Sequence, residues 1–321
     1  MTSHPTDPRI GGRALTLNLR YTAASDVGML REENEDSAYA GAHLVAVADG
    51  VGGNVHGEVA SAVAIATLAS LDKSLPADEL AGCLRTAVQE IDQALQQMVD
   101  SDSSLEGMST TLTALLFSDG RCCLGHIGDS RAYLVRDGML RQVSRDHSLV
   151  QTLVDEGKIT QEQAAVHPQR SVILQALNGR GSARADIDLS DAEAGDRWLL
   201  CSDGLSDYVS GDAILETVTG SADLDAMAAR LISLANAAGG PDNITCVLAD
   251  VVDDAAQDTP LTVGAAAFPA PAQAADEPTS PLRRRWWQSL LGDRTARVDG
   301  SAPPSATTDD ENPTPAPDTH R

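Results

Sequence analysis

Positively charged residues are scarce in this chain of 321 residues. Lysine and arginine together number 23, against 47 aspartates and glutamates, which gives a net charge of −24 at pH 7. Because proteins hold nucleic acids mainly through lysine and arginine contacts to phosphates, this balance argues against a nucleic-acid partner. An acidic protein that binds an anionic substrate needs local positive charge, which a metal ion or a well-placed arginine can supply.

Cysteine is also sparse, and its spacing excludes several kinds of site. The five cysteines form no CxxC pair, and they fall within predicted helices and strands, which favours buried free thiols in a reducing compartment. A cysteine phosphatase needs an arginine six positions after its nucleophile. The residues at that distance are Gln89, Gly128, Asp129, Asp207 and Val252. The sequence also contains neither a GxSxG serine elbow nor a GxxxxGK[ST] phosphate loop.

Long apolar runs are absent as well. No run approaches the roughly 18–20 residues that a membrane-spanning helix needs, and the N-terminal segment MTSHPTDPRIGG has no apolar core of the kind found in secretory signals. We therefore expect a cytoplasmic protein. Residues 1–13 and the Ala-, Pro- and Asp-rich residues 253–321 are expected to be disordered.

One island in this tail, residues 283–291, combines three arginines with two of the three tryptophans of the chain. Such residues settle at membrane interfaces or in partner grooves, so a weak contact with a membrane or a partner is one hypothesis. It would place the protein peripherally at the inner membrane face. The alternative is a remnant of a membrane segment without a present role.

Residues 14–252 mix strands with helices. Apolar runs predict seven strands, and Asp-Gly turns at 118–120 and 136–138 predict antiparallel hairpins. Helical spacing of apolar residues predicts helices over 60–71, 80–98 and 224–235, and residues 146–182 are interpreted as a polar flap with short helical pieces. The result is an α+β fold of mainly antiparallel sheets covered by helices. The predicted strands are Thr16–Ala24, His43–Ala48, Thr111–Phe117, Cys122–Ile127, Ala132–Val135, Trp198–Cys201 and Ile244–Val251.

Four aspartates lie at the ends of these strands, each next to a glycine, serine or asparagine. They are Asp49, Asp129, Asp203 and Asp242. Carboxylates gathered from separate strand ends repel one another unless a cation lies among them, and hard divalent ions such as Mg²⁺ prefer oxygen ligands. The pattern therefore predicts a metal-dependent hydrolase with phosphate as its target. Each site also has an ordinary explanation, since a single Asp-Gly or Asp-Ser often does no more than shape a turn.

Three neighbouring features extend this prediction. In Asp49-Gly50, the glycine carbonyl is free to face the same ion as the carboxylate. If Leu205 opens a helical turn, Asp203 and Asp207 can reach one ion. Arg31 precedes a run of acidic residues, and its planar guanidinium suits a bidentate phosphate contact, although a solvated charged loop is the simpler explanation from these residues alone.

The order of the motifs resembles the bacterial branch of the protein phosphatase 2C (PP2C, PPM) serine/threonine phosphatases from about Arg20 to Val252, particularly actinobacterial members that oppose membrane Ser/Thr kinases. The blocks that carry this resemblance are SDVGMLREENEDS, VAVADGVGGNVHGEVAS, GMSTTLTALL, LGHIGDSRAYLVRDG, VSRDHSLVQTLVDEGKIT, HPQRSVILQAL, LLCSDGLSD and GGPDNITCVLADV.

The resemblance implies a four-layer αββα sandwich with two Mn²⁺ or Mg²⁺ ions at one end of the sheets. By motif position, Asp49 would bridge both ions, with the Gly50 carbonyl completing one and Asp203 with Asp242 the other. Asp129, Asp203 and Asp207 match a third, weaker metal site. The residues expected around these ligands are Glu35 and Asp36, which would hold metal-bound waters, and Asn243. Arg31 matches the arginine that binds the substrate phosphate, which reverses the preference for a solvated loop.

The reaction that the resemblance implies is direct attack of a metal-bridging hydroxide on phosphorus, without a phosphoenzyme. Eukaryotic members carry a histidine after the Asp-Gly pair, whereas this chain has Val51. A metal-bound water is then expected to protonate the leaving group, with His56 and His147 as alternatives. The expected partners are phosphorylated Ser/Thr proteins, including Ser/Thr kinases, and we expect the protein to be a monomer.

Two other functions fit parts of the sequence. A catalytically inactive phosphoprotein-binding adaptor on the same fold would have lost one or more metal carboxylates, yet Asp49, Asp203 and Asp242 are all present. A hydrolase of small phosphoesters would keep the site but would need a deep enclosed pocket. The flap is the region where we expect substrate preference to be set.

Overall fold

The protein is described from a computed structural model, which covers residues 17–51, 56–181, 183–220, 223–254 and 257–267. The predicted disordered N-terminus and most of the predicted tail, including the island at 283–291, lie outside these residues. None of the helices in these ranges combines the length and the apolar character needed to cross a membrane.

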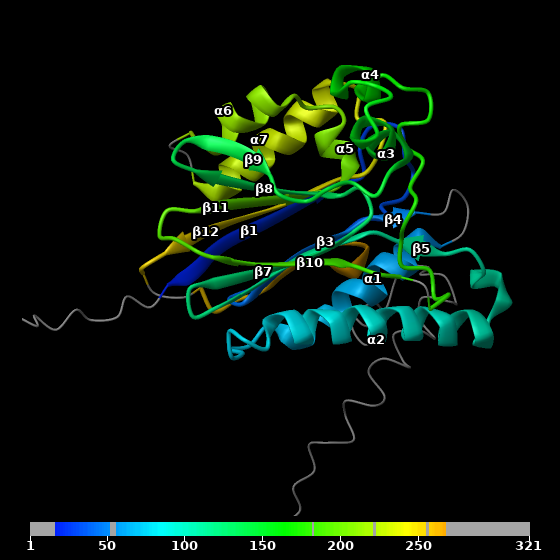
Figure 1. Cartoon of the computed structure of the whole chain (residues 1–321), viewed down its shortest axis with the longest axis horizontal. Helices are drawn as coiled ribbons and strands as arrows, with labels where there is room; N and C mark the ends of the chain where they lie inside the picture. The colour runs from blue at the N-terminus through cyan, green and yellow to red at the C-terminus, as the bar shows by residue number, and fades with distance from the viewer. Residues whose placement is uncertain (1–16, 52–55, 182, 221–222, 255–256, 268–321) are drawn as a thin grey trace, which may run out of the picture. The chain divides into compact units, whose positions relative to one another are not determined.

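Two antiparallel sheets form the centre of the molecule (Figure 1). The first has five strands in the order β1-β12-β11-β8-β9. These strands are β1 (Asn18–Asp26), β12 (Ile244–Val252), β11 (Arg197–Cys201), β8 (Arg131–Arg136) and β9 (Met139–Gln142).

The second sheet has six strands in the order β10-β7-β6-β3-β2-β13. They are β10 (Asp186–Asp191), β7 (Arg121–Ile127), β6 (Leu112–Ser118), β3 (Leu44–Ala48), β2 (Ser37–Ala40) and β13 (Leu261–Gly264). The short strands β4 (Gly50–Val51) and β5 (Ser109–Thr110) pair separately.

Helices cover the outer face of each sheet. On the six-stranded sheet, α1 (Gly57–Leu68) packs against β2 and β3, and α2 (Leu80–Ser101) packs against β7 and β10. On the five-stranded sheet, α7 (Leu224–Ala237) packs against β1 and β12, and α6 (Gly211–Val218) packs beside it. The predicted four-layer αββα sandwich is therefore confirmed (Figure 1).

The alternation of side chains along β12 shows why these layers form. Val247, Ala249 and Val251 are buried in the core between the two sheets. Cys246 and Leu248 face the opposite way and pack with residues of α6 and α7. Because successive side chains of a strand point to opposite faces, a continuously apolar strand belongs in a sheet that is covered on both sides.

The seven predicted strands and three predicted helices are all present, with ends shifted by a few residues. Both predicted hairpins are present too. Asp119 with Gly120 and Asp137 with Gly138 adopt positive φ angles between 50° and 73°, which a tight two-residue turn requires. The predicted flap contains α3 (Leu149–Asp155) and α4 (Gln161–Ala165).

The predicted end of the ordered domain at Val252 is too early. Residues 261–264 form β13, which pairs with β2, and the short turn Ala265–Ala267 packs against α1. Leu261 and Val263 supply apolar contacts to the core between the sheets. Without this strand the edge of β2 would be unpaired. Pairing with β2 therefore orders residues 261–264, although the Ala- and Pro-rich composition of the tail predicts disorder.

Candidate active site

The four strand-end aspartates lie at one end of the sandwich. Asp49 follows β3, Asp129 lies two residues after β7, and Asp203 opens the short helix α5 (Asp203–Ser206) two residues after the end of β11. Asp242 precedes β12, which pairs antiparallel with β11, so the end of one strand lies beside the start of the other. The fold thus brings together residues that are far apart in the sequence.

Burial and the charges of neighbouring carboxylates raise the pKa values of Asp49, Asp129 and Asp203. Burial is the largest cause of a pKa well above the usual range for both Asp49 and Asp203, followed by the charges of nearby aspartates. For Asp129, burial raises the pKa to about 7, with further contributions from Asp146 and Asp207. The aspartates that interact in this way are Asp36, Asp49, Asp129, Asp203, Asp207 and Asp242. Carboxyl groups that act on one another in this way need protons or a cation to relieve their repulsion.

The donor atoms suit a hard divalent ion, although they do not form a complete coordination shell. One carboxylate oxygen of Asp129, Oδ1, is buried without a hydrogen-bond partner. Among the described residues, however, no group of three or more His, Cys, Asp or Glu side chains could hold a metal ion as they are arranged. Asp242 instead pairs with Arg31, whose Nη2 lies 2.9 Å from its carboxylate. The residues thus offer the oxygen donors that a hard divalent ion prefers, and these donors lie at the same end of the sandwich.

Gly50 is needed where three segments meet beside Asp49. Its amide donates to the carbonyl oxygen of Glu35 over 3.2 Å. A Cβ at this position would lie 2.4 Å from the carbonyl oxygen of Gly57, which opens α1. Only glycine allows this approach, and it leaves the backbone next to Asp49 free of side-chain cover.

Asn243 positions the loop that carries Arg31. Its Nδ2 donates to the carbonyl oxygens of Val27 and Glu33 at 3.0 and 2.9 Å, and its Oδ1 accepts from the amide of Glu35 at 2.8 Å. The residue was predicted near the ligands, but this bracing role has no local sequence signal because its partners are more than 200 positions away.

Glu35 and Asp36, the predicted water-holding pair, differ in environment. Burial, followed by the charge of Glu58, raises the pKa of Glu35. Asp36 is 1% exposed, and burial raises its pKa to about 6 although the hydroxyl of Ser202 donates to it over 2.7 Å. Since Ser202 precedes Asp203, this hydrogen bond ties the loop after β1 to the end of β11.

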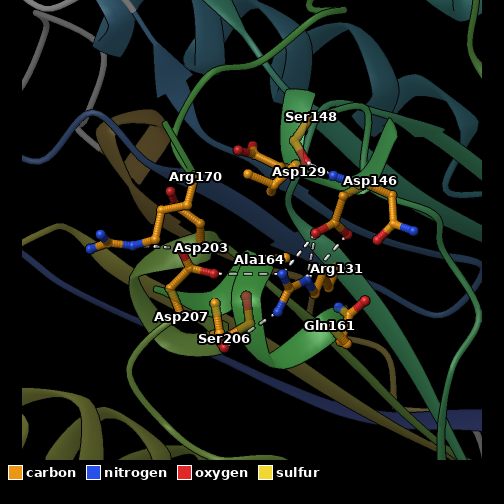
Figure 2. Close-up of a pocket in the computed structure, with 13 residues that line it drawn as sticks. Asp129, Arg131, Asp146, Ser148, Gln161, Ala164, Arg170, Asp203, Ser206 and Asp207 are labelled. Carbon is orange, nitrogen blue, oxygen red and sulfur yellow. Dashed lines mark hydrogen bonds and ion pairs between the residues drawn. The ribbon is translucent and has the colours of Figure 1, made fainter. Parts of the chain in front are cut away.

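Next to Asp129, Arg131 and Asp146 form an ion pair, and neither residue was among the predicted site residues (Figure 2). Arg131 donates to Asp146 through Nε and Nη2 at distances of 2.7 to 3.1 Å, and its Nη2 lies 3.5 Å from Asp207. Arg170 of the flap lies 3.9 Å from Asp207. These residues, with Asp203, line a pocket of about 140 Å³. Arg131 and Asp146 belong to the GDSR and SRDH sequences, which are the signal that could have identified them.

His147 supports the strand end, and both of its ring nitrogens are engaged. Nδ1 accepts from the amide of Gly128 at 3.2 Å, and Nε2 lies 3.2 Å from Asp186. Its own backbone amide donates to the carbonyl oxygen of Gly128 at 2.7 Å. His56 is paired differently, with its Nδ1 3.3 Å from Glu58. Neither histidine has a free Nδ1, and His147 has no free ring nitrogen to protonate a leaving group.

The cysteines have no part in this site. Cys122, Cys123, Cys201 and Cys246 are buried, and burial is the main cause that raises the pKa of each thiol, to about 12 for Cys122 and about 11 for Cys123. Thiols with such pKa values remain protonated at neutral pH and are poor nucleophiles.

Comparison with known proteins agrees with these features. Residues 32–249 match the family model described as protein phosphatase 2C. The chain is 53% identical, over 252 residues, to the serine/threonine protein phosphatase PstP of Mycobacterium tuberculosis, an alignment that covers 78% of this chain and 49% of that protein. The chain thus spans about half the length of this relative.

Two further relatives are covered over almost their full length. A serine/threonine phosphatase, stp, of Listeria monocytogenes is 35% identical over 235 residues, which are 70% of this chain and 93% of that protein. A solved structure of the PstP catalytic domain in complex with two manganese ions superposes with a TM-score of 0.69 at 51% identity, and the match covers 74% of this chain and all of that one.

Proposed function

This chain belongs to the protein phosphatase 2C family, and we propose that it hydrolyses phosphoserine and phosphothreonine in proteins with Mn²⁺ or Mg²⁺ as cofactor. The observation that carries the proposal is the group of mutually repelling aspartates, of which Asp129 is buried and Asp49 and Asp203 are partly buried. Without a bound cation, gathering these three carboxylates would only reduce the stability of the fold. The manganese complex of the PstP catalytic domain supports the choice of metal.

In this proposal the residues divide into ligands and supports. Asp49, the Gly50 carbonyl, Asp203 and Asp242 would hold two ions. Asp129 and Asp207, together with Asp203, would hold a third and weaker one. The chemistry that such ions supply when bound is activation of water as hydroxide and stabilisation of negative charge on the phosphoryl oxygens.

The protein's own groups then orient the substrate. The Arg31 side chain is 46% exposed and close to Asp242, so its guanidinium can reach a phosphate that enters from solvent. If the phosphate replaced the Asp242 carboxylate, the guanidinium fork could donate to two phosphate oxygens, and Asp242 would be free as a ligand. Glu35 and Asp36 would hold ordered waters. The hydrogen bonds of Asn243 to the backbone of Glu33 and Glu35 hold the Arg31 loop next to Asp242.

Phosphorylated Ser/Thr proteins, among them Ser/Thr kinases, are the partners that we propose. An exposed phosphate-binding arginine at a surface site suits a phosphorylated protein segment better than a small metabolite, which would need enclosure. A monomer would be sufficient for this reaction, because every proposed site residue comes from one chain.

The test is hydrolysis of a phosphothreonine peptide with Mn²⁺, with and without a chelator, for the native chain and for Asp203→Asn. We expect strong dependence on Mn²⁺ and a loss of about 10²-fold or more in kcat for the variant, as when a charge-stabilising group is removed. Asp188→Asn, an exposed aspartate of β10, controls for the change in net charge. Full activity of Asp203→Asn, or peptide binding without hydrolysis, would refute the proposal.

A further inference from the structure

Two large apolar side chains are exposed immediately before Arg31. Met29 is 66% and Leu30 is 73% exposed. Single exposed apolar residues are common and need no explanation, but an adjacent pair beside a proposed phosphate-binding residue is a different case. We call these two residues the apolar lip.

The backbone beneath the lip is held firmly. The Met29 amide donates to the carbonyl oxygen of Gly240 at 2.7 Å, and Asn243 binds the carbonyl oxygens on both sides of the lip, those of Val27 and Glu33. Gly28 has a φ of +79°, and a Cβ there would lie 2.1 Å from the carbonyl oxygen of Asp242. These contacts fix the backbone of the loop, so the two side chains of the lip stay exposed.

The lip also lies within reach of any peptide whose phosphate is bound by Arg31. Consecutive Cα atoms are 3.8 Å apart, and an extended peptide advances about 3.3 Å per residue. When Arg31 holds the phosphate of a peptide that runs along this loop, the peptide residues one or two positions away lie opposite Leu30 and Met29, because both chains have the same Cα spacing. Figure 1 shows the chain that leaves β1, in dark blue, at the same end of the molecule as α3 and α5.

We propose that Met29 and Leu30 bind a bulky apolar side chain of the substrate next to the phosphorylated residue, so that the enzyme prefers phosphorylated segments with such a neighbour. This inference rests on the proposed function and specifies its substrate class. The contact would bury apolar surface on both partners, and that burial favours association. It forms equally in the bound substrate and in the transition state, so we expect it to change KM more than kcat.

The experiment compares phosphothreonine peptides that differ only at the two positions on either side of the phosphothreonine, with leucine, glutamine or lysine there. With Mn²⁺ present, we expect kcat/KM for the best leucine peptide to exceed that for the matched glutamine peptide by about 5- to 30-fold, as for partial burial of one aliphatic side chain on an exposed surface. In the double variant Met29→Gln, Leu30→Gln this ratio should fall to about 1.

Met139→Gln is the matched control. Met139 is 69% exposed, but it lies on β9 beyond the far end of β8, whose first residue is Arg131 at the site. Five residues of strand place it roughly 17 Å away. This variant should keep the native ratio, and all variants should melt at the native temperature, because the substituted side chains are exposed.

Three results would overturn the proposed role of the lip while leaving the phosphatase proposal intact. They are a leucine-to-glutamine ratio of kcat/KM near 1 in the native protein, a preference for lysine alone, and an unchanged ratio in the double variant. Failure of the native protein to hydrolyse any of the peptides would remove the proposed function, and the lip with it.

Discussion

Replacing Asp129 by asparagine should stabilise the metal-free protein at pH 8. The Asp129 carboxyl group is 7% exposed, its Oδ1 has no hydrogen-bond partner, and burial followed by the charges of Asp146 and Asp207 raises its pKa to about 7. An acid whose pKa is higher in the folded than in the unfolded state destabilises the fold increasingly as pH rises between the two values, and fully above the higher one.

The size of this effect follows from the two pKa values. Because the pKa rises from 3.8 in the unfolded chain to about 7 in the folded protein, the Asp129 carboxylate lowers the free energy of unfolding by at most about 4 kcal/mol at pH 8. At pH 5 the loss is less than half as large, because most of the folded-state carboxyl is still protonated. An asparagine leaves an amide buried, so we expect a net gain of about 2–3 kcal/mol at pH 8, which raises the melting temperature by roughly 4–12 °C.

The assay is thermal unfolding in chelator at pH 5 and pH 8, followed by circular dichroism. Asp188→Asn removes the same charge from an exposed position and corrects for general relief of the net charge of −24. With Mn²⁺ present, the advantage of Asp129→Asn should shrink, because bound cation already offsets the repulsion in the native protein. An Asp129→Asn protein no more stable than native at pH 8, or a gain no larger than that of Asp188→Asn, would show that the Asp129 carboxylate does not destabilise the metal-free fold.

Three other variants or treatments test separate parts of the structure. Arg31→Lys replaces a bidentate fork by a single ammonium, so KM for a phosphopeptide should rise by about 5- to 20-fold, and an unchanged KM would argue against a phosphate contact. His147→Ala removes the acceptor of the Gly128 amide, so the free energy of unfolding in urea should fall by about 1–3 kcal/mol, whereas a native midpoint would show that this hydrogen bond contributes nothing. Iodoacetamide at pH 8 should leave activity intact, because burial raises the pKa of Cys122 and Cys123 to about 12 and about 11, and mass spectrometry that finds either thiol labelled in the active protein would contradict this.

The parts of the fold that could be predicted from sequence are those with a local cause. Continuous apolar runs such as Ile244–Val252 and Asp-Gly turns at 119–120 and 137–138 determine strands and hairpins within a few residues. By contrast, β10 has the sequence DIDLSD, which has little apolar character because it is an edge strand exposed over most of its length. Its position depends on pairing with β7, more than 50 residues earlier.

The same distinction applies to the site. An aspartate at a strand end is a local feature, so Asp49, Asp129, Asp203 and Asp242 could be found without coordinates. The partner of each charged group could not. A guanidinium fits a phosphate and a carboxylate equally well, and only the fold places Arg31 on Asp242 and Arg131 on Asp146.

We propose that Asp49, Asp203 and Asp242 hold a pair of divalent ions. A crystal of this chain grown or soaked with Mn²⁺ and measured at the manganese absorption edge would show whether they do. We predict two anomalous peaks among the oxygens of Asp49, Gly50, Asp203 and Asp242, with Asp242 released from Arg31. Density without manganese among these carboxylates, or with manganese only elsewhere on the protein, would contradict it.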